Sequence, residues 1–399
     1  MIHKNYDIVC VGGGLSGFAA ALASAHSGMK TLLTERAYSL GGEAAGKPAF
    51  LTGSDQGNIL GDLADELLFR LRKYHGCAEV IHRPGQGDFI PLNSEALKVA
   101  MMQMCREAGV ELLFSCVPIQ KESRNVFRFW GKGEQLLLEG KRFIDGTING
   151  ELASLAGAEI EFSGPAPASL PLVFSQVHWE TVLRYAQEHP DDVQADPECR
   201  CLEGFAQLLL KCQLPFSSLR CFQAAEHGRT VVEAVRISGI DETDPESLSS
   251  GIESASLQAL ELYRKLQNGF PGFSQCRLSS VAQSLKIQGT RRFRCQAAVS
   301  LEECDEKALL RFPAFEGEKA CLVPVGAWLP NGVDNLVLAG HCLSAKASTP
   351  SALYAEGVQM ALGEAAGIYA SLSVHKGLVS KNQLREELAK RASFSMLLV

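Results

Sequence analysis

The sequence of 399 residues predicts an α/β protein in which a parallel-sheet domain is interrupted by a smaller α+β domain. Three observations predict this class. The chain begins with a short apolar run, a glycine-rich turn and an alanine-rich stretch. The pattern of a buried strand returns near its C-terminal end. Between these two regions lie shorter strand-like runs. We expect the parallel-sheet domain to comprise residues 1–165 and 286–380, the inserted domain residues 166–285, and a final helix residues 381–399.

The first unit reads as strand, turn, helix and strand. Residues 6–11 are an apolar run typical of a strand buried on both faces. Residues 12–17 contain four glycines and form the turn, and residues 18–27 are rich in alanine, a strong helix former. A second strand is expected over residues 30–34, so the segment predicts a βαβ unit.

Further elements follow from apolar periodicity and from glycine and proline positions. Helices are expected over residues 58–73, 94–108, 251–267, 350–371 and 382–392. Strands are expected over residues 110–114, 136–139, 142–145 and 335–340. In the middle of the chain an antiparallel meander is expected over residues 206–211, 219–224 and 230–237, with one turn at His227-Gly228.

Composition excludes several classes of function. The formal charge is −7 and Lys and Arg form no basic block, so no nucleic-acid partner is expected. No apolar run reaches the roughly 18 residues that cross a bilayer, so no membrane partner is expected. Thirteen cysteines lie scattered without a CxxC pair, which favours reduced thiols, a cytoplasmic location and no metal site. Residues 23–25 resemble a signal-peptide cleavage site, but Asp7 and residues 12–14 interrupt the apolar core that such a signal needs.

The pattern Gly12-x-Gly14-x-x-Gly17 lies between the first strand and the first helix. In a dinucleotide-binding unit the first glycine permits the tight turn, the second lets the backbone approach a pyrophosphate, and the third lets helix and strand pack closely. The helix N-terminus then offers free N–H groups and partial positive charge to the phosphates. Glu35, at the end of the second strand, is placed to accept hydrogen bonds from a ribose. The sequence therefore predicts a Rossmann-like dinucleotide site.

Further stretches resemble the FAD-dependent oxidoreductase family allied to fumarate reductases and glutathione-reductase-type flavoproteins. After Glu35-Arg36 comes the doublet Gly41-Gly42, and residues 332–340 precede a long helix. The resemblance extends over residues 143–153, 271–273, 290–292, 339–345 and 361–367.

The resemblance implies an FAD cofactor and the residues that hold it. Glu43 is expected to contact a cofactor hydroxyl, and the helix expected to begin near Thr349-Pro350-Ser351 to direct its N-terminus at the flavin. The cofactor-binding residues that it implies are Gly12, Gly14, Leu15, Ser16, Gly17, Glu35, Arg36, Gly41, Gly42, Glu43, Val117, Asp145, Gly146, Thr147, Gly340, Ser351 and Ala352.

The sequence departs from the family pattern at three positions where cationic side chains are expected. Gln288 and Gly289 replace an Arg-Glu pair, His341 follows Gly340 where Arg is frequent, and Tyr354 takes the place of another Arg. An anionic substrate such as a dicarboxylate is therefore not expected.

Arg291, Arg292, His341 and Tyr354 are the candidate catalytic residues. The arginines could polarise a substrate carbonyl or carboxylate, although a salt bridge between the two domains is the slightly favoured explanation. Histidine exchanges protons near neutral pH, and a tyrosine hydroxyl can donate one; packing is the alternative for both.

The expected activity is hydride transfer between a small organic substrate and flavin N5. No second GxGxxG occurs in the middle of the chain, so a separate electron donor or acceptor is expected. Two alternatives remain open: a non-catalytic or sensory flavin-binding protein, and an NAD-dependent dehydrogenase. The sequence leaves open the substrate, the direction of reaction, covalent attachment of FAD and the oligomeric state.

Overall fold

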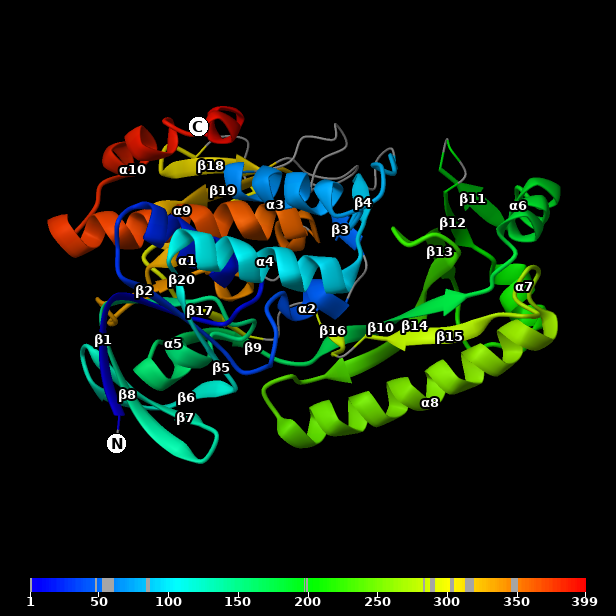
Figure 1. Cartoon of the computed structure of the whole chain (residues 1–399), viewed down its shortest axis with the longest axis horizontal. Helices are drawn as coiled ribbons and strands as arrows, with labels where there is room; N and C mark the ends of the chain where they lie inside the picture. Colours follow the sequence, from blue (N-terminus) through cyan, green and yellow to red (C-terminus); the bar gives the residue numbers. More distant parts are fainter. Residues whose placement is uncertain are drawn as a thin grey trace.

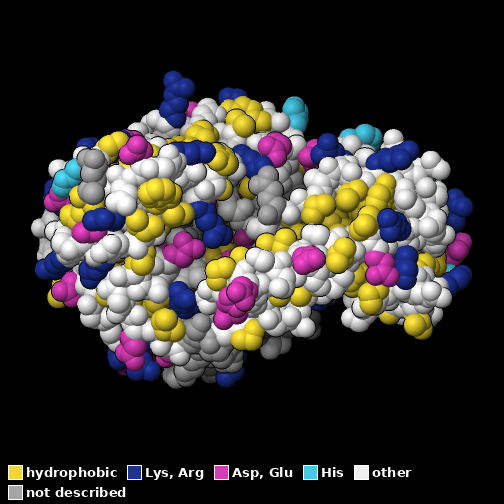
Figure 2. Space-filling model, turned by 90° about the horizontal axis from the view of Figure 1, so that it is seen from below, with side chains coloured by type: hydrophobic (Ala, Val, Ile, Leu, Met, Phe, Trp, Pro, Cys, Tyr) yellow, Lys and Arg dark blue, Asp and Glu magenta, His cyan; other side chains and the backbone are white. Residues whose placement is uncertain are grey.

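The computed structural model describes the chain apart from a few short segments. The described residues are 2–46, 49–51, 61–83, 87–196, 198, 200–282, 284–287, 291–301, 305–312, 319–345 and 351–399. Two sheets, each with its own helices, form two lobes that lie side by side (Figure 1). Seen from below, a narrower waist joins the lobes, and Lys, Arg, Asp and Glu are interspersed over this face (Figure 2).

The first sheet contains the predicted βαβ unit. Its strands are β1 (Ile2–Val11), β2 (Thr31–Glu35), β5 (Glu111–Phe114), β6 (Cys116–Ser123), β7 (Val126–Gly131), β8 (Glu134–Asp145) and β20 (Leu336–Leu338). The order β5-β2-β1-β8 is parallel throughout, and β20 adds to β8 in parallel. β6, β7 and the first half of β8 form an antiparallel meander. Because the carboxyl ends of β1, β2 and β8 meet at one edge, the glycine-rich turn lies there.

Helices pack tightly against this sheet and against one another. α1 (Leu15–His26), α3 (Asp62–Lys73), α4 (Ser94–Ala108) and α9 (Glu356–Lys376) lie together on one side of it (Figure 1). The backbone of α9 approaches that of α1 closely, since a Cβ built on Gly363 would lie 2.0 Å from the Ser16 carbonyl oxygen. A Cβ on Gly367 would lie 2.3 Å from the Ala20 carbonyl oxygen. The two glycines, four residues apart, therefore set the spacing of the helices.

The second sheet is antiparallel and has its own apolar core. Its strands are β10 (Ala166–Ser175), β11 (Val193–Ala195), β12 (Cys201–Gly204), β13 (Leu219–Gln223), β14 (Arg229–Ile240), β15 (Arg277–Val281) and β16 (Lys286–Ile287). The order is β11-β12-β13-β14-β10-β15, and β16 also pairs with β10. α8 (Pro245–Gly269) runs along the sheet and buries Ala255, Ala259, Leu262 and Leu266 against it (Figure 1). α6 (Trp179–Glu188) and α7 (Ala206–Lys211) lie at the end far from the first sheet.

Short elements connect and cover the sheets. They are α2 (Gly42–Gly46), β3 (Ala49–Leu51), β4 (Phe89–Pro91), α5 (Glu151–Ala156), β9 (Ile160–Ser163), β17 (Arg291–Phe293), β18 (Ala308–Phe312), β19 (Cys321–Pro324), η1 (Val325–Trp328), η2 (Gly340–Cys342), η3 (Ser351–Tyr354), α10 (Lys381–Leu388) and η4 (Ala392–Met396). β9 pairs with β17, so the chain leaves the first lobe and returns to it at one place.

This mixed fold, with a Rossmann-like parallel sheet and a separate antiparallel sheet, is the predicted class. One part of the predicted meander is wrong: residues 206–211 form α7 and not a strand. An apolar run this short fits either state by periodicity. Here the Asp192 carboxylate accepts hydrogen bonds from the backbone N–H groups of Gln207 and Leu208 and so caps the start of a helix.

Other boundaries also differ from the prediction. Residues 134–145 are one continuous strand, because the first half of β8 pairs with β7 and the second with β20. The long helix begins at Glu356, after the 3-10 turn η3, and not at residue 350. The final segment is divided into α10 and η4, and residues 58–60 of the predicted second helix lie outside the described residues.

Among the described helices, none combines the length and the apolarity needed to span a bilayer.

The contact between α1 and α9 predicts a stability difference between two glycine-to-alanine variants. Gly363→Ala forces a methyl group against the Ser16 carbonyl, so we expect a loss of about 1–3 kcal/mol in the free energy of unfolding. Gly14→Ala is the matched control, since its Cβ meets nothing within 4 Å. Urea denaturation of the cofactor-free proteins measures both values; equal values for the two variants would contradict this packing.

Candidate functional site

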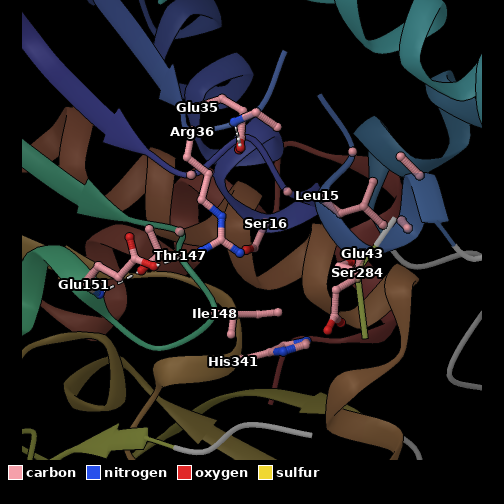
Figure 3. A pocket seen from close by; sticks show the side chains of 18 of the residues that line it. Leu15, Ser16, Glu35, Arg36, Glu43, Thr147, Ile148, Glu151, Ser284 and His341 are labelled. Atoms are coloured by element: carbon pink, nitrogen blue, oxygen red, sulfur yellow. Dashed lines mark hydrogen bonds and ion pairs between the residues drawn. The ribbon is translucent and has the colours of Figure 1, made fainter. Parts of the chain in front are cut away.

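A cavity opens at the carboxyl edge of the first sheet and extends to the second sheet. The glycine-rich turn and α2 line it from the first lobe, and Glu242 with Ser284–Ile287 line it from the second. The volume of the cavity is about 350 Å³. Glu35 and Arg36 lie at one end, while Glu43, Ser284 and His341 lie at the other (Figure 3).

The glycine-rich turn owes its shape to backbone contacts. Gly12 has φ +97°, and a Cβ there would lie 2.8 Å from the Gly146 carbonyl carbon. A Cβ on Gly17 would lie 2.0 Å from the Gly12 carbonyl oxygen. Both positions therefore exclude any larger residue, and α1 starts directly against the ends of β1 and β8.

Gly14 differs from these two glycines. Its φ of −65° and ψ of 175° suit any residue, and a Cβ there would meet no atom within 4 Å. The added atom would extend into the cavity that Gly14 lines. Gly14 is also the N-cap of α1, and no side chain caps this helix end. The contacts within the chain thus give no reason for a glycine here, whereas close approach of a ligand to the helix N-terminus does.

Glu35 is buried at the end of β2, and its carboxylate is fixed by backbone donors. The Gly13 N–H donates to Oε2 at 2.6 Å, and the Ala37 N–H donates to Oε1 at 2.7 Å. A carboxylate has about four acceptor positions, so both oxygens keep capacity for a ligand hydroxyl. Glu35 thus joins the glycine-rich turn to the end of β2 and also lines the cavity.

Asp145 supports the same edge from below the cavity. It is completely buried and accepts hydrogen bonds from the N–H and hydroxyl of Thr147 and from the N–H of Ala153. Burial raises the pKa of Asp145 to about 6, against the lowering effect of these donors. Its contacts fix the Gly146-Thr147 turn, so it positions the cavity wall and is not part of it.

At the opposite end, three predicted catalytic residues meet. Arg292 is buried, donates to the Ala345 carbonyl oxygen at 3.0 Å and also donates to the Tyr354 hydroxyl oxygen. The Tyr354 and His341 rings meet edge to face with centroids 5.1 Å apart. Burial lowers the pKa of His341 to about 4 and raises the pKa of Tyr354 above its usual value. Both rings are therefore neutral at pH 7.

A group of charged side chains surrounds this end as well. The Ile287 N–H donates to Glu43 Oε1 at 3.2 Å and so joins α2 of the first lobe to β16 of the second. Burial raises the pKa of Glu43 to about 7, and the charges of Glu242 and Glu356 act in the same direction. Lys286 opposes them. Glu242 and Glu356 are thus the like charges around Glu43 and Lys286 is the opposite one, and burial also raises the pKa of Glu242.

Most of the predicted cofactor-binding residues line this cavity. They are Gly12, Gly14, Leu15, Ser16, Glu35, Arg36, Gly41, Gly42, Glu43, Val117, Gly146 and Thr147. Gly17, Asp145 and Gly340 instead pack behind its wall; Gly340 has φ +86° and approaches Ser16 and Gln359. For Ser351 and Ala352 the structure describes the backbone only, in η3, and Gln288–Thr290 and Thr349-Pro350 lie outside the described residues.

The four predicted catalytic residues do not all reach the cavity. His341 and Tyr354 line it, whereas Arg292 lies behind Tyr354 and donates a hydrogen bond to its hydroxyl oxygen. Arg291 is on β17, opposite Ser163, and is not among the described residues that line the cavity.

Sequence reasoning missed many residues that line the cavity, including all of those from the second lobe. The additional lining residues are Val11, Thr34, Ala37, Ser39, Ala44, Ala45, Cys116, Pro118, Ile148, Glu151, Glu242, Ser284, Leu285, Lys286, Ile287, Glu356 and Gln359. Glu242 and Ser284–Ile287 carry no motif, because their position depends on how the second sheet meets the first. Glu356 could have been found once the true start of α9 was known.

The sequence itself decides the family. Residues 7–313 and 314–390 match the profile of a family described as FAD dependent oxidoreductase. The chain belongs to this family. It is an FAD-dependent oxidoreductase, and its cofactor is FAD. The alternative of an NAD-dependent dehydrogenase is thereby excluded. No curated protein matches the sequence.

Solved structures show the same fold at low sequence identity. The p-nitrophenol 4-monooxygenase PnpA from Pseudomonas putida DLL-E4 is 13% identical, with a TM-score of 0.55 over 97% of this chain and 84% of that one. The halogenase PltM is 10% identical, with a TM-score of 0.53 over 96% of this chain and 72% of its own. The flavin-dependent brominase Bmp2 is 12% identical, with a TM-score of 0.51 over 97% and 84%. This FAD-dependent oxidoreductase is thus similar in fold to a p-nitrophenol 4-monooxygenase, a halogenase and a flavin-dependent brominase.

In the described part of the chain, no group of three or more His, Cys, Asp or Glu side chains is arranged to hold a metal ion.

Gly14 gives a direct prediction for the cofactor. Gly14→Ala fills the space at the α1 N-terminus without touching the protein, so we expect FAD affinity to fall by about tenfold or more. The free energy of unfolding of the cofactor-free variant should stay within about 1 kcal/mol of wild type. Titration of the cofactor-free protein with FAD, followed by flavin fluorescence, measures the affinity; wild-type affinity in the variant would show that no ligand approaches this turn.

Proposed function

We propose that this protein transfers a hydride between a carbon of a small organic substrate and N5 of bound FAD. The observation that carries the proposal is the polarity of the cavity. One end has the acidic residue and the uncapped helix N-terminus suited to an adenosine diphosphate. The other end carries Glu43, His341 and Tyr354, side chains that exchange or donate protons.

The residues expected to bind FAD fall into two groups, one at each end of the cavity. Glu35 would hold the adenosine ribose, with Val117 beside the adenine. Gly14 and the α1 N-terminus would hold the diphosphate, and Arg36, which forms an exposed ion pair with Glu151 at 3.3 Å, would lie along it. The remaining length of the cavity leads to α2, β16 and the start of α9, where the flavin ring would lie. FAD supplies the two-electron chemistry there.

The protein side chains at that end would bind and orient the substrate. Tyr354 keeps its proton at neutral pH because of its raised pKa, and Arg292 fixes the position of its hydroxyl. The neutral His341 imidazole has an Nδ1 atom that is buried without a hydrogen-bond partner among the described residues. Tyr354 and His341 would therefore offer hydrogen bonds to an oxygen or nitrogen on the substrate.

Charge further restricts the substrate. Glu43, Glu242 and Glu356 face the cavity with Lys286, and Arg292 lies behind Tyr354. A carboxylate-rich wall disfavours anionic compounds by repulsion. We therefore propose a neutral or cationic small molecule as substrate.

We propose one domain of residues 1–165 and 286–380, an inserted substrate domain of residues 166–285, a cytoplasmic location and a separate electron donor or acceptor. The distinct apolar cores of the two sheets support a division into two domains, although β16 (Lys286–Ile287) pairs within the second sheet and so belongs with the inserted domain. The kinship with fumarate reductases and glutathione-reductase-type flavoproteins stays a prediction.

Oxygen-dependent substitution of a substrate is a second candidate reaction. The similar structures include a p-nitrophenol 4-monooxygenase and a flavin-dependent brominase. In such a reaction the enzyme would consume oxygen and a reductant when the substrate is added. A substrate of the proposed hydride transfer would instead bleach FAD in the absence of oxygen. A sensory flavin protein would do neither.

Tyr354→Phe tests the proposed role of this end of the cavity. With FAD-loaded protein and no oxygen, we screen neutral alcohols and amines by the loss of flavin absorbance. For a compound that bleaches wild type, the variant should react about a hundredfold more slowly, because the hydroxyl that orients the substrate oxygen or nitrogen is gone. Its FAD affinity should change by less than about threefold.

Tyr74→Phe, which alters an exposed tyrosine at the end of α3, is the matched control and should react like wild type. Equal rates in Tyr354→Phe and wild type would remove Tyr354 from the mechanism. If no compound of either class bleaches wild type, the proposed hydride transfer is contradicted.

A further inference from the structure

Glu43 lies at the end of the cavity that faces the second lobe. It follows the Gly41-Gly42 doublet in α2, and Gly41 is joined to the glycine-rich turn by a hydrogen bond from its N–H to the Gly13 carbonyl oxygen, 2.9 Å long. With the diphosphate at Gly14, the carboxylate of Glu43 lies beyond it, on the side of His341 and Ser284 (Figure 3). This position rests on the orientation of FAD given under the proposed function.

We propose that Glu43 is the residue that binds and releases a proton when the bound FAD is reduced and reoxidised. Two-electron reduction of the bound cofactor, by a hydride from a substrate or by two electrons from a small-molecule reductant and one proton from water, would leave one negative charge at the flavin end of the cavity. A carboxylate fixed beside that charge takes one proton from water and becomes a neutral carboxylic acid. On reoxidation two electrons and the flavin's own proton would leave, and the Glu43 proton would return to water, so atoms and charges balance.

The surroundings of Glu43 suit this role. Its Oε1 is held by the Ile287 N–H, a donor that stays available in both protonation states because the proton can reside on Oε2. The charged and titratable groups that face it are Glu242 from the segment after β14, Lys286 from β16 and Glu356 from α9. Within α2 it is the only titratable residue. Burial and, to a smaller extent, Glu242 and Glu356 disfavour the ionised form of Glu43, while the Ile287 N–H and Lys286 favour it, so the ionised and protonated forms are close in free energy.

The other proton-exchanging side chains at this end are less suited to it. The pKa of His341 lies at about 4 and that of Tyr354 lies above its usual value, both because of burial. Neither changes its charge near neutral pH, whereas the pKa of Glu43 is about 7. A negative charge on reduced FAD raises the pKa of Glu43 further, so proton uptake occurs at and above pH 7.

The test is the pH dependence of the midpoint potential of bound FAD, measured with redox dyes and without substrate. Well below pH 7 Glu43 is protonated in both redox states and contributes no proton. From about pH 7 to 8.5, wild type should take up one proton more per two electrons than Glu43→Gln. Each such proton changes the ratio of reduced to oxidised FAD tenfold per pH unit, about 30 mV for a two-electron couple.

Three further proteins complete the test. Glu43→Gln keeps an oxygen that accepts from the Ile287 N–H, and its FAD affinity is measured first. Glu43→Asp retains a carboxylate and should keep the extra proton. Glu253→Gln, an exposed change of the same charge on α8, should behave as wild type.

Equal pH slopes for wild type and Glu43→Gln would overturn the proposal. If Glu43→Gln does not bind FAD, the wild-type protein alone tests the proposal. A wild-type pH slope that shows no additional proton above pH 7 would then overturn it. The reductant in this titration is a dye, so the measurement needs no substrate. Failure to find a substrate would contradict the proposed hydride transfer without changing the result for Glu43.

Discussion

The close contact of α1 with the ends of β1 and β8 is the constraint on which the site depends. At Gly12, Gly17 and Gly146 the backbones approach so closely that no Cβ fits. The contact brings the first N–H groups of α1 to the edge of the parallel sheet, where they cannot be satisfied within the helix. An anionic ligand at that place gains hydrogen bonds and a favourable interaction with the helix dipole.

The same constraint extends to the C-terminal part of the chain. Gly363 and Gly367 let α9 lie against α1, and Gly340, the first residue of η2, approaches Ser16. The start of α9, with Glu356, thereby reaches the cavity from a position more than 300 residues away in the chain. At Gly363 and Gly367 the contact is with the backbone of α1, and at Gly340 it is with the Ser16 and Gln359 side chains, so small changes at these glycines would displace both ends of the site.

The sequence was sufficient where a local pattern has one structural solution. The strand, glycine turn and helix at residues 6–27 belong to this kind, as does the buried strand near residue 337. It was insufficient where tertiary contacts choose between states. Asp192 caps residues 206–211 as a helix, and pairing with β7 and β20 makes β8 continuous. Glu242 and Ser284–Ile287 could not be predicted, because they join the cavity only through the docking of the second sheet.

The central claim is that FAD lies with its adenosine at Glu35 and its flavin ring at Glu43. A crystal structure of the protein with FAD tests it most directly. The account predicts a ribose hydroxyl within hydrogen-bond distance of the Glu35 carboxylate, phosphate oxygens at the N-terminus of α1, and the flavin ring against Glu43 and His341. Cofactor density in the reverse orientation, or outside this cavity, would contradict it.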